Sequence, residues 1–179
     1  MLIRRSLPTA PNDRDSKSPF FAELERQGLT PSREMIFVGR EPGVEDITSR
    51  LGLAAGSEVI ARRKKLMADD VPVRIATSYF SPALFPEGGL DVGEFIMPTL
   101  QSEIRSAGHE FGHADEILRS RPATESEIEQ FGCESDEWVV EILRTSYDTA
   151  ETPVHVLQTV CLASLHEFDI VQPKDRDAF

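Results

Sequence analysis

The segment 58–80, EVIARRKKLMADDVPVRIATSYF, constrains the fold most, because it has the pattern of two long strands joined by a tight turn. Its valines, isoleucines and terminal aromatic residues suit a pleated, half-buried surface. Asp69 and Asp70 tolerate left-handed backbone and can bond their own main chain, so the chain can reverse there. The segment therefore predicts a long antiparallel β-hairpin around which the other elements are organised.

Four consecutive basic residues, Arg62 to Lys65, lie in the first strand of this hairpin. Because alternate residues of a strand face opposite sides, Arg62 and Lys64 share one face, and Arg63 and Lys65 share the other. We expect one pair to meet solvent and the other to point to the covered side of the sheet. A cation on the covered side is costly unless an anion lies beside it. The run therefore favours a small anionic ligand, or simple solvation, over contact with DNA.

The rest of the chain alternates short helical patterns with strand patterns. Helices are predicted at 19–28, 44–51, 99–107 and 125–131, and strands at 31–40, within 108–121, and at 136–147, 154–162 and 166–171. Thr124 and Glu127 have the spacing of a capping box at the start of the fourth helix. Residues 81–98 are rich in proline and glycine and predict a loop. No internal repeat of fixed period is evident.

This order of elements predicts one α+β domain, built on an antiparallel sheet of about six strands with flanking helices. Residues 1–17 contain two prolines and mixed charges without an apolar period, so they predict a linker or tail. The domain is expected to span residues 18–179, which is long enough for a proper hydrophobic core.

The acidic excess of the chain limits its partners. It has 31 acidic against 19 basic residues and a net charge of −12, so nucleic acid is repelled unless basic residues gather on one face. No apolar run is long enough to span a membrane, and no secretory leader precedes a small-residue cleavage site. We therefore expect a cytoplasmic protein without direct contact to DNA or membrane.

Neither a metal nor another cofactor is predicted. Cys133 and Cys161 lack the spacing of a metal site and are expected to be buried thiols in a reducing compartment. His109 and His113 are four residues apart, but the adjacent glycines and the strand pattern argue against a helix that could hold zinc. The sequence also contains no phosphate-binding glycine loop, nucleophile elbow or HExxH motif.

Polar side chains near the ends of the predicted strands are the candidate binding residues. They are Arg62, Lys64, Ser78, Tyr79, Arg119, Arg144, Tyr147 and His155, together with Thr99 at the start of the third helix. Each alone fits a surface ion pair, a hydrogen bond at a strand end or an ordinary helix cap. Together, cations and hydroxyl groups on neighbouring strands could converge on an anionic or polyhydroxy ligand, and a helix start adds unpaired backbone N–H groups.

Three segments in this order resemble the UTRA effector-binding domain of HutC-type GntR transcription regulators, in the style of actinobacterial members. They are VIARRKKLMADDVPVRIATSYF, DEILRSRPATESEIEQFG and WVVEILRTSYDTAETPVHV, and the resemblance covers residues 18–171. It implies a chorismate-lyase-like fold, a small-molecule pocket and a homodimer formed through this domain. It also implies that an anionic metabolite, such as a sugar phosphate or a carboxylate, shifts the DNA affinity of a separate winged helix-turn-helix domain.

The chain departs from that family pattern at three points. Only residues 1–17 precede the resemblance, so we expect the winged-helix domain to be missing from this sequence. Lys64 and Leu66 stand where many members have two arginines, and His155 stands where many have glutamate. Because histidine can donate or accept a hydrogen bond and can titrate near neutral pH, we expect a ligand class that differs from the sugar phosphates.

Two other functions fit the same pattern. One is an enzyme with the chorismate-lyase fold, in which Glu116 or Glu141 would supply the acid. The other is a stand-alone dimerisation partner of intact regulators, which would need no pocket. The leading interpretation is an effector-binding domain without catalysis.

Overall fold

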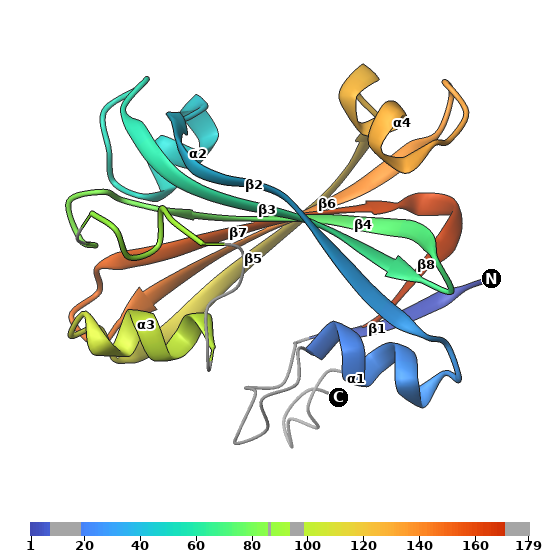
Figure 1. Ribbon diagram of the computed structural model, residues 1–179, viewed down its shortest axis with the longest axis horizontal. Helices are drawn as coiled ribbons and strands as arrows, with labels where there is room; N and C mark the ends of the chain where they lie inside the picture. The colour runs from blue at the N-terminus through green and yellow to red at the C-terminus, as the bar shows by residue number, and fades with distance from the viewer. Residues whose placement is uncertain (8–18, 86, 94–98, 171–179) are drawn as a thin grey trace, which may run out of the picture.

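A computed structural model describes residues 1–7, 19–85, 87–93 and 99–170 (Figure 1). The elements are β1 (Ile3–Leu7), α1 (Pro19–Arg26), β2 (Pro31–Pro42), α2 (Glu45–Arg50), β3 (Glu58–Ala68), β4 (Val71–Phe80), α3 (Leu100–Ser106), β5 (Phe111–Pro122), α4 (Glu125–Phe131), β6 (Trp138–Asp148), β7 (Pro153–Leu162) and β8 (His166–Ile170). The predicted α+β class is confirmed. Among the described helices, none is long and apolar enough to cross a membrane.

Six strands form one antiparallel sheet in the order β2-β3-β4-β7-β6-β5. The predicted hairpin is β3 and β4, near the middle of the sheet. Its turn uses Asp69 and Asp70, whose φ angles of 48° and 64° lie in the left-handed region that short polar side chains tolerate. The sheet is strongly twisted, so that its edge strands β2 and β5 cross one another in Figure 1.

The element order repeats, although no repeat was expected from the sequence. Each half of the sheet consists of a long strand, a short helix and a hairpin, which gives β2-α2-β3-β4 and then β5-α4-β6-β7. A short helix precedes each half. The two halves meet along β4 and β7, where Thr77 lies opposite Gln158. β2 and β5 begin at residues 31 and 111 and β3 and β6 begin at 58 and 138, so both pairs are 80 residues apart, whereas β4 and β7 begin at 71 and 153 and are 82 apart. The expectation that the chain has no internal repeat is therefore wrong at the level of its elements.

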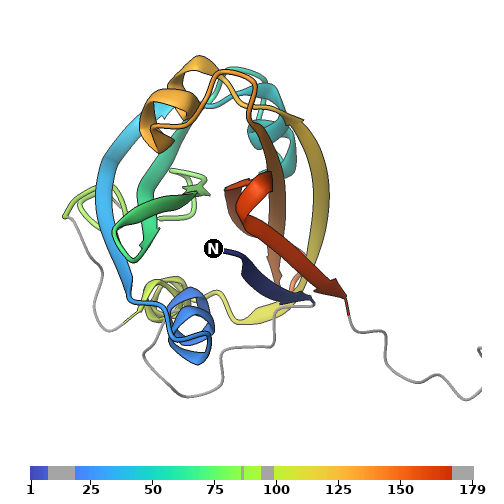
Figure 2. The ribbon, with the colours of Figure 1, turned by 90° about the vertical axis from the view of Figure 1, so that its right-hand side faces the viewer.

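The helices cover both faces of the sheet (Figures 1 and 2). On one face, which we call the α2/α4 face, Leu51 of α2 packs against Tyr79, and Phe131 of α4 packs against Ile75. On the opposite face, which we call the α1/α3 face, α1 packs on the sheet through Leu24. This second face is also covered by α3 and by the loop after β4, whose apolar residues join Ile60 and Phe80 of the sheet in one cluster, with Phe85, Leu90, Leu100 and Ile104.

Residues 3–7, expected to belong to a linker or tail, form strand β1. It pairs in parallel with β8, and the two make a separate small sheet. The short strand predicted at 166–171 therefore exists over 166–170, but it does not extend the main sheet. It pairs instead with β1, which is held beside α1 by the fully buried side chain of Ile3. The remaining residues of the expected linker, 8–18, lie outside the described residues, as do residues 94–98 of the predicted loop.

Candidate functional site

The four basic residues of β3 divide between the faces as predicted, but neither pair is left to solvent. On the α2/α4 face, Arg63 forms an ion pair with Glu41 at 2.8 Å, and Lys65 forms one with Glu34 at 3.4 Å. Both partners belong to the neighbouring strand β2, and both basic side chains are about one quarter exposed or less. The charge of this pair is therefore neutralised within the sheet.

Arg62, on the α1/α3 face, holds the loop that follows β4. Its guanidinium group is buried and donates hydrogen bonds to the carbonyl oxygens of Leu90 at 2.7 Å, Val92 at 3.2 Å and Gly93 at 3.3 Å. Burial lowers the pKa of Arg62 below its ordinary value. Through these three hydrogen bonds Arg62 fixes the loop to β3.

Lys64, two residues further along the same face, has no such partners. Within the described part of the chain, no hydrogen-bond acceptor and no carboxylate pairs with its ammonium group, and the side chain is only partly exposed. Burial lowers the pKa of Lys64, and the nearby charges of Arg33 and Arg62 lower it further. A cation in this position lacks the compensation that buried charges ordinarily have.

His155 of β7 lies on the same face. Its ring stacks on Phe80 of β4, with 4.8 Å between the ring centroids and 10° between the planes. Its Nε2 atom is buried and has no hydrogen-bond partner among the described residues. Burial, followed by the charges of Arg144 and Lys64, lowers the pKa of His155 to about 3. The expectation that His155 titrates near neutral pH is therefore wrong, and the ring is neutral there.

Ser78 and Arg144 complete a group on this face. Ser78 lies opposite Arg62 in β3 and opposite Leu157 in β7, and Leu157 in turn lies opposite Arg144 in β6. Arg144 is one quarter exposed, and its guanidinium is 3.6 Å from the carboxylate of Glu116 in β5. We call Lys64, Ser78, Arg144 and His155 the Lys64 cluster. It joins the four central strands and carries two buried or half-buried groups without a partner within the described residues.

The other four predicted residues lie elsewhere. Tyr79 is on the α2/α4 face, where its hydroxyl donates to Gln158 at 3.2 Å. Arg119 is on the same face and contacts Glu141 and, at 2.7 Å, Asp46 of α2. Thr99 caps α3, since its side chain accepts a hydrogen bond from the backbone of Ser102. Tyr147 stacks on His113 near the β6–β7 turn. These residues are engaged by the protein and do not meet the Lys64 cluster.

Two residues of this region were not predicted. Phe80 stacks on His155, and its place two residues after Ser78 could have assigned it to the same face. Arg33 of β2 raises the positive potential at Lys64, but it acts across a pairing with β3 whose register no local pattern reveals. Sequence patterns therefore define the face of each strand better than they define its neighbours.

Two hollows lie away from the Lys64 cluster. One, of about 530 Å³, lies beside β1 and is lined by the chain start, by Arg4 of β1, by Gln27 and Leu29 after α1, and by Asp69 of the β3–β4 turn. The other, of about 150 Å³, lies between α3 and the loop after β4. No group of three metal-ligating side chains occurs in the described ranges. Both cysteines are free, and Cys133 is partly exposed whereas Cys161 is buried.

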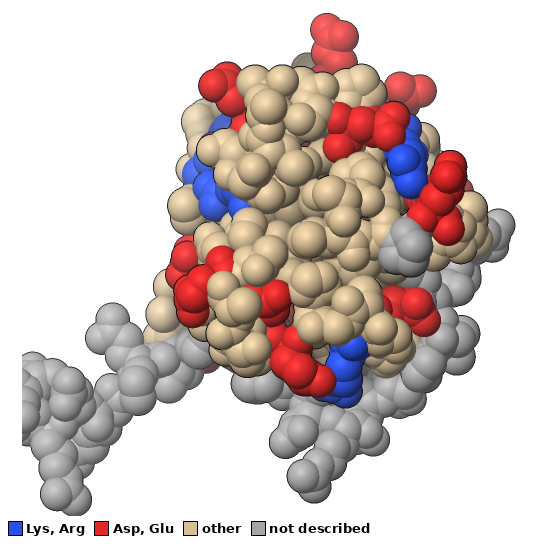
Figure 3. All heavy atoms as spheres, turned by 90° about the vertical axis from the view of Figure 1, so that its left-hand side faces the viewer, with Lys and Arg blue, Asp and Glu red and all other residues tan. Residues whose placement is uncertain are grey.

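The surface agrees with the overall charge. On the side of the molecule that includes α2, α3 and the loop after β4, acidic side chains are scattered widely, and basic side chains form only small patches beside them (Figure 3). A face of this kind repels a polyanion such as DNA. The cations of the Lys64 cluster are instead partly buried on the α1/α3 face.

Comparisons with known proteins agree with this architecture. The chain is similar to the effector domain of PhnF from Mycobacterium smegmatis, with a TM-score of 0.74 and 20% identity over 96% of this chain and 100% of that chain. The structure of PhnF itself gives 0.73 and 18%, with 97% and 73% covered. A structure described as a GntR-family transcriptional regulator gives 0.81 and 16%, with 98% and 71% covered. At these identities the likeness concerns the fold. No curated protein matches the chain.

The family assignment depends on a separate comparison. The family model of the UTRA domain matches residues 26–167, which is most of the chain and includes all six strands of the main sheet. One of the structures with the same fold is likewise an effector domain. The chain therefore belongs to the UTRA domain family.

Proposed function

We propose that this chain is the effector-binding domain of a GntR-type transcription regulator of the HutC subfamily, and that the Lys64 cluster binds a small anionic effector. One observation carries the proposal: the buried Nε2 atom of His155 and the half-buried ammonium group of Lys64 lie on one face and both lack a partner within the described residues. Buried polar groups are nearly always hydrogen-bonded, so an unpartnered imidazole nitrogen beside an unpaired cation favours a small polar ligand.

The chemistry of the cluster indicates what the ligand carries. An anionic group can pair with Lys64, because charge-assisted hydrogen bonds to a carboxylate or phosphate are the strong ones. Arg144, which already lies 3.6 Å from the carboxylate of Glu116, provides a guanidinium group as a second cation on the same face. His155 is neutral, so its Nε2 atom supplies one donor or one acceptor but no charge. The hydroxyl of Ser78 offers a further hydrogen bond. We infer a ligand with one anionic group and at least one neutral polar group near it.

Catalysis has less support than binding. Of the two acids that a lyase would need, Glu141 lies on the α2/α4 face and is held by Arg119, Arg121 and Gln158. Glu116 lies on the α1/α3 face, where its carboxylate is 3.6 Å from the guanidinium of Arg144. It is therefore engaged in an ion pair and is poorly suited to act as a general acid. We therefore infer a domain that binds its ligand without transforming it.

The test is the thermal unfolding of the chain in the presence of small anions. Phosphate, phosphorylated sugars, dicarboxylates and acidic amino-acid derivatives are added singly at millimolar concentration. A ligand that binds the folded state at about 100 times its Kd adds about 2.7 kcal/mol of stability, which is a shift of several degrees. Lys64→Met is expected to abolish that shift. Lys65→Met, next in sequence but on the opposite face, is expected to retain it.

Two results would contradict the proposal. One is the absence of stabilisation by every anion in the panel. The other is a shift that survives Lys64→Met but is lost in Lys65→Met, which would place binding on the α2/α4 face. Incubation with chorismate gives a separate check on catalysis, since no release of 4-hydroxybenzoate is expected.

We also propose that the domain forms a homodimer in the cytoplasm and that DNA is bound by a separate winged helix-turn-helix domain. The outer strand β5 supports an association surface, because three large apolar side chains on it are exposed: Phe111 by 55%, Ile117 by 47% and Leu118 by 38%. Sedimentation equilibrium is expected to give twice the chain mass, and Ile117→Lys is expected to give the monomer. A wild-type chain that sediments as a monomer at micromolar concentration would rule out the dimer.

A further inference from the structure

β1 lies outside the main sheet, and Ile3 is the buried residue among its described side chains. Ile3 is fully buried in a cluster with Phe20 and Leu24 of α1 and with Ala68 at the end of β3. The backbone of β1 pairs in parallel with β8 from Ile3, opposite His166, to the end of the strand (Figure 2). The burial of Ile3 and the backbone pairing with β8 thus hold β1 together.

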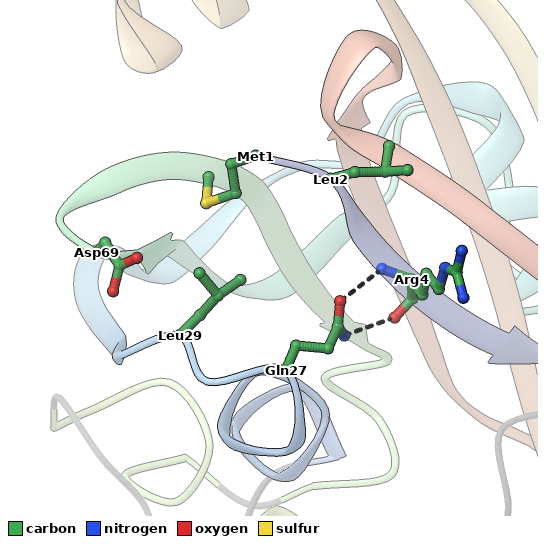
Figure 4. A pocket seen from close by; sticks show the side chains of 6 residues that line it. All are labelled: Met1, Leu2, Arg4, Gln27, Leu29 and Asp69. Atoms are coloured by element: carbon green, nitrogen blue, oxygen red, sulfur yellow. Dashed lines mark hydrogen bonds between the residues drawn. The ribbon is translucent and has the colours of Figure 1, made fainter.

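Gln27, immediately after α1, holds the other edge of β1. Its side-chain oxygen accepts a hydrogen bond from the backbone N–H of Arg4, and its side-chain nitrogen donates to the carbonyl of Arg4, both at 3.1 Å (Figure 4). One side chain therefore makes the pair of backbone hydrogen bonds that a neighbouring strand would make. The same nitrogen also donates to the carbonyl of Glu23, which fixes its direction.

Arg4 is the other side chain of β1 that the structure describes, and it is exposed to solvent. Arg4 forms an ion pair with Glu167 at 3.0 Å, but the two side chains are 72% and 49% exposed, so the pair adds little. Leu2 is half exposed and, with Met1 and Leu29, lines the hollow beside β1 (Figure 4). A short strand at the chain end that lies outside the main sheet can open locally without unfolding of the whole domain.

We propose that the edge of β8, the side chain of Gln27 and the cavity around Ile3 form a docking site for an extended segment, and that residues 3–7 of the same chain are its reversible occupant. This is strand addition, in which backbone hydrogen bonds give affinity and a side-chain pocket gives specificity. The site fits an aliphatic residue followed by a basic one, because Ile3 fills the cavity and Arg4 faces Glu167.

Displacement of β1 tests the docking site directly. Ile3→Asp places a carboxylate in the apolar cavity and expels the strand, while Leu2→Asp, at the exposed neighbouring position, serves as the matched control. A fluorescent peptide of sequence MLIRRSL is titrated into both variants and into the wild-type chain. Saturable binding is expected for Ile3→Asp. The wild-type chain and Leu2→Asp are expected to bind the peptide at least about tenfold more weakly than Ile3→Asp does, because their own strand occupies the site.

The outcomes separate the alternatives. Absence of peptide binding to Ile3→Asp, or equal binding to all three chains, overturns the proposal. A peptide with aspartate in place of isoleucine must bind to none of them.

Hydrogen exchange of the wild-type chain decides the matter even if Ile3→Asp fails to fold. The amides of residues 3–7 are expected to exchange faster than those of β3 and β4, and Gln27→Ala is expected to accelerate them several-fold while β3 and β4 are unchanged. Exchange of β1 only together with β3 and β4 would make it a permanent part of the core and overturn reversibility. Protection that rises with chain concentration would assign the strand to a second copy and overturn the assignment to the same chain.

Discussion

Among single residues, Lys64 separates what the domain needs for stability from what the proposed site needs for binding. Its ammonium is half-buried beside Arg33 and Arg62 and has no partner within the described residues, so the charge opposes folding. We expect Lys64→Met to raise the free energy of unfolding by about 1 kcal/mol, as measured by urea denaturation without ligand. Lys65→Met, which loses the ion pair to Glu34, is the control and is expected to bring no gain. A destabilised Lys64→Met chain would mean that Lys64 serves the fold.

His155 predicts a pH dependence with a definite sign. Its pKa is about 3 in the folded chain, against an ordinary value of 6.5, so below pH 6.5 the unfolded chain takes up a proton that the folded chain does not. Stability is therefore full above pH 6.5 and falls by up to about 1.4 kcal/mol per pH unit as the pH decreases towards 3. His155→Phe keeps a ring stacked on Phe80 and removes the titration, so its urea stability between pH 7 and 5 is expected to be flatter. Equal slopes in both proteins would contradict the burial of His155.

At the scale of elements, Arg62 links the sheet to the loop after β4. Its three hydrogen bonds to Leu90, Val92 and Gly93 are charge-assisted, and they are buried at Leu90 and partly buried at Val92 and Gly93. Arg62→Met is expected to cost about 2 kcal/mol and to raise hydrogen exchange in residues 88–93. Arg63→Met, its neighbour on the opposite face, is expected to leave exchange in that loop unchanged. Unaltered exchange in Arg62→Met would show that the loop is held by its apolar contacts alone.

The elements were more predictable than the site. Local chemistry defines them: Asp69 and Asp70 reverse the chain, and Thr124 and Glu127 form the predicted capping box of α4. The site depends on long-range pairing. Ser78 belongs to the Lys64 cluster, whereas Tyr79, one residue later, points to the opposite face, and nothing in the sequence near Arg119 shows that Glu141 will neutralise it.

Patterns also fail where the anchor is a single residue. Ile3 has no apolar period around it, so the strand that it anchors looked like part of a linker.

For the whole molecule, the two halves of the sheet are joined by a polar network on the α2/α4 face. Gln158 of the second half accepts from Tyr79 of the first half and donates to Glu141 at 2.6 Å. Glu141 also contacts Arg119, which reaches Asp46 of α2 in the first half. Because α2 and β4 in one half thus share partners with β5 and β7 in the other, we expect the halves to unfold together in spite of their repeated architecture.

Substitution of Glu141 tests whether the two halves unfold cooperatively, since its carboxylate is buried at the centre of the network. Burial alone would raise its pKa, but the hydrogen bonds from Arg119 and Gln158 and the charge of Arg121 outweigh it and hold the pKa of Glu141 below its ordinary value. Its contribution is therefore present above pH 4.5 and is lost as the pH falls through the folded-state pKa, a lower window than that of His155.

At pH 7, Glu141→Gln is expected to lower the free energy of unfolding by about 2 kcal/mol, because Arg119 and Arg121 lose a buried partner. Asp46→Asn, which removes only the exposed end of the network, is expected to cost less than about 1 kcal/mol. Both variants should unfold in urea in one transition with the wild-type m-value, seen alike by circular dichroism and by the fluorescence of Trp138 in the second half. Two transitions in the wild-type chain would contradict the common unfolding of the halves, whereas two transitions only in Glu141→Gln would show that the halves are coupled mainly through this carboxylate.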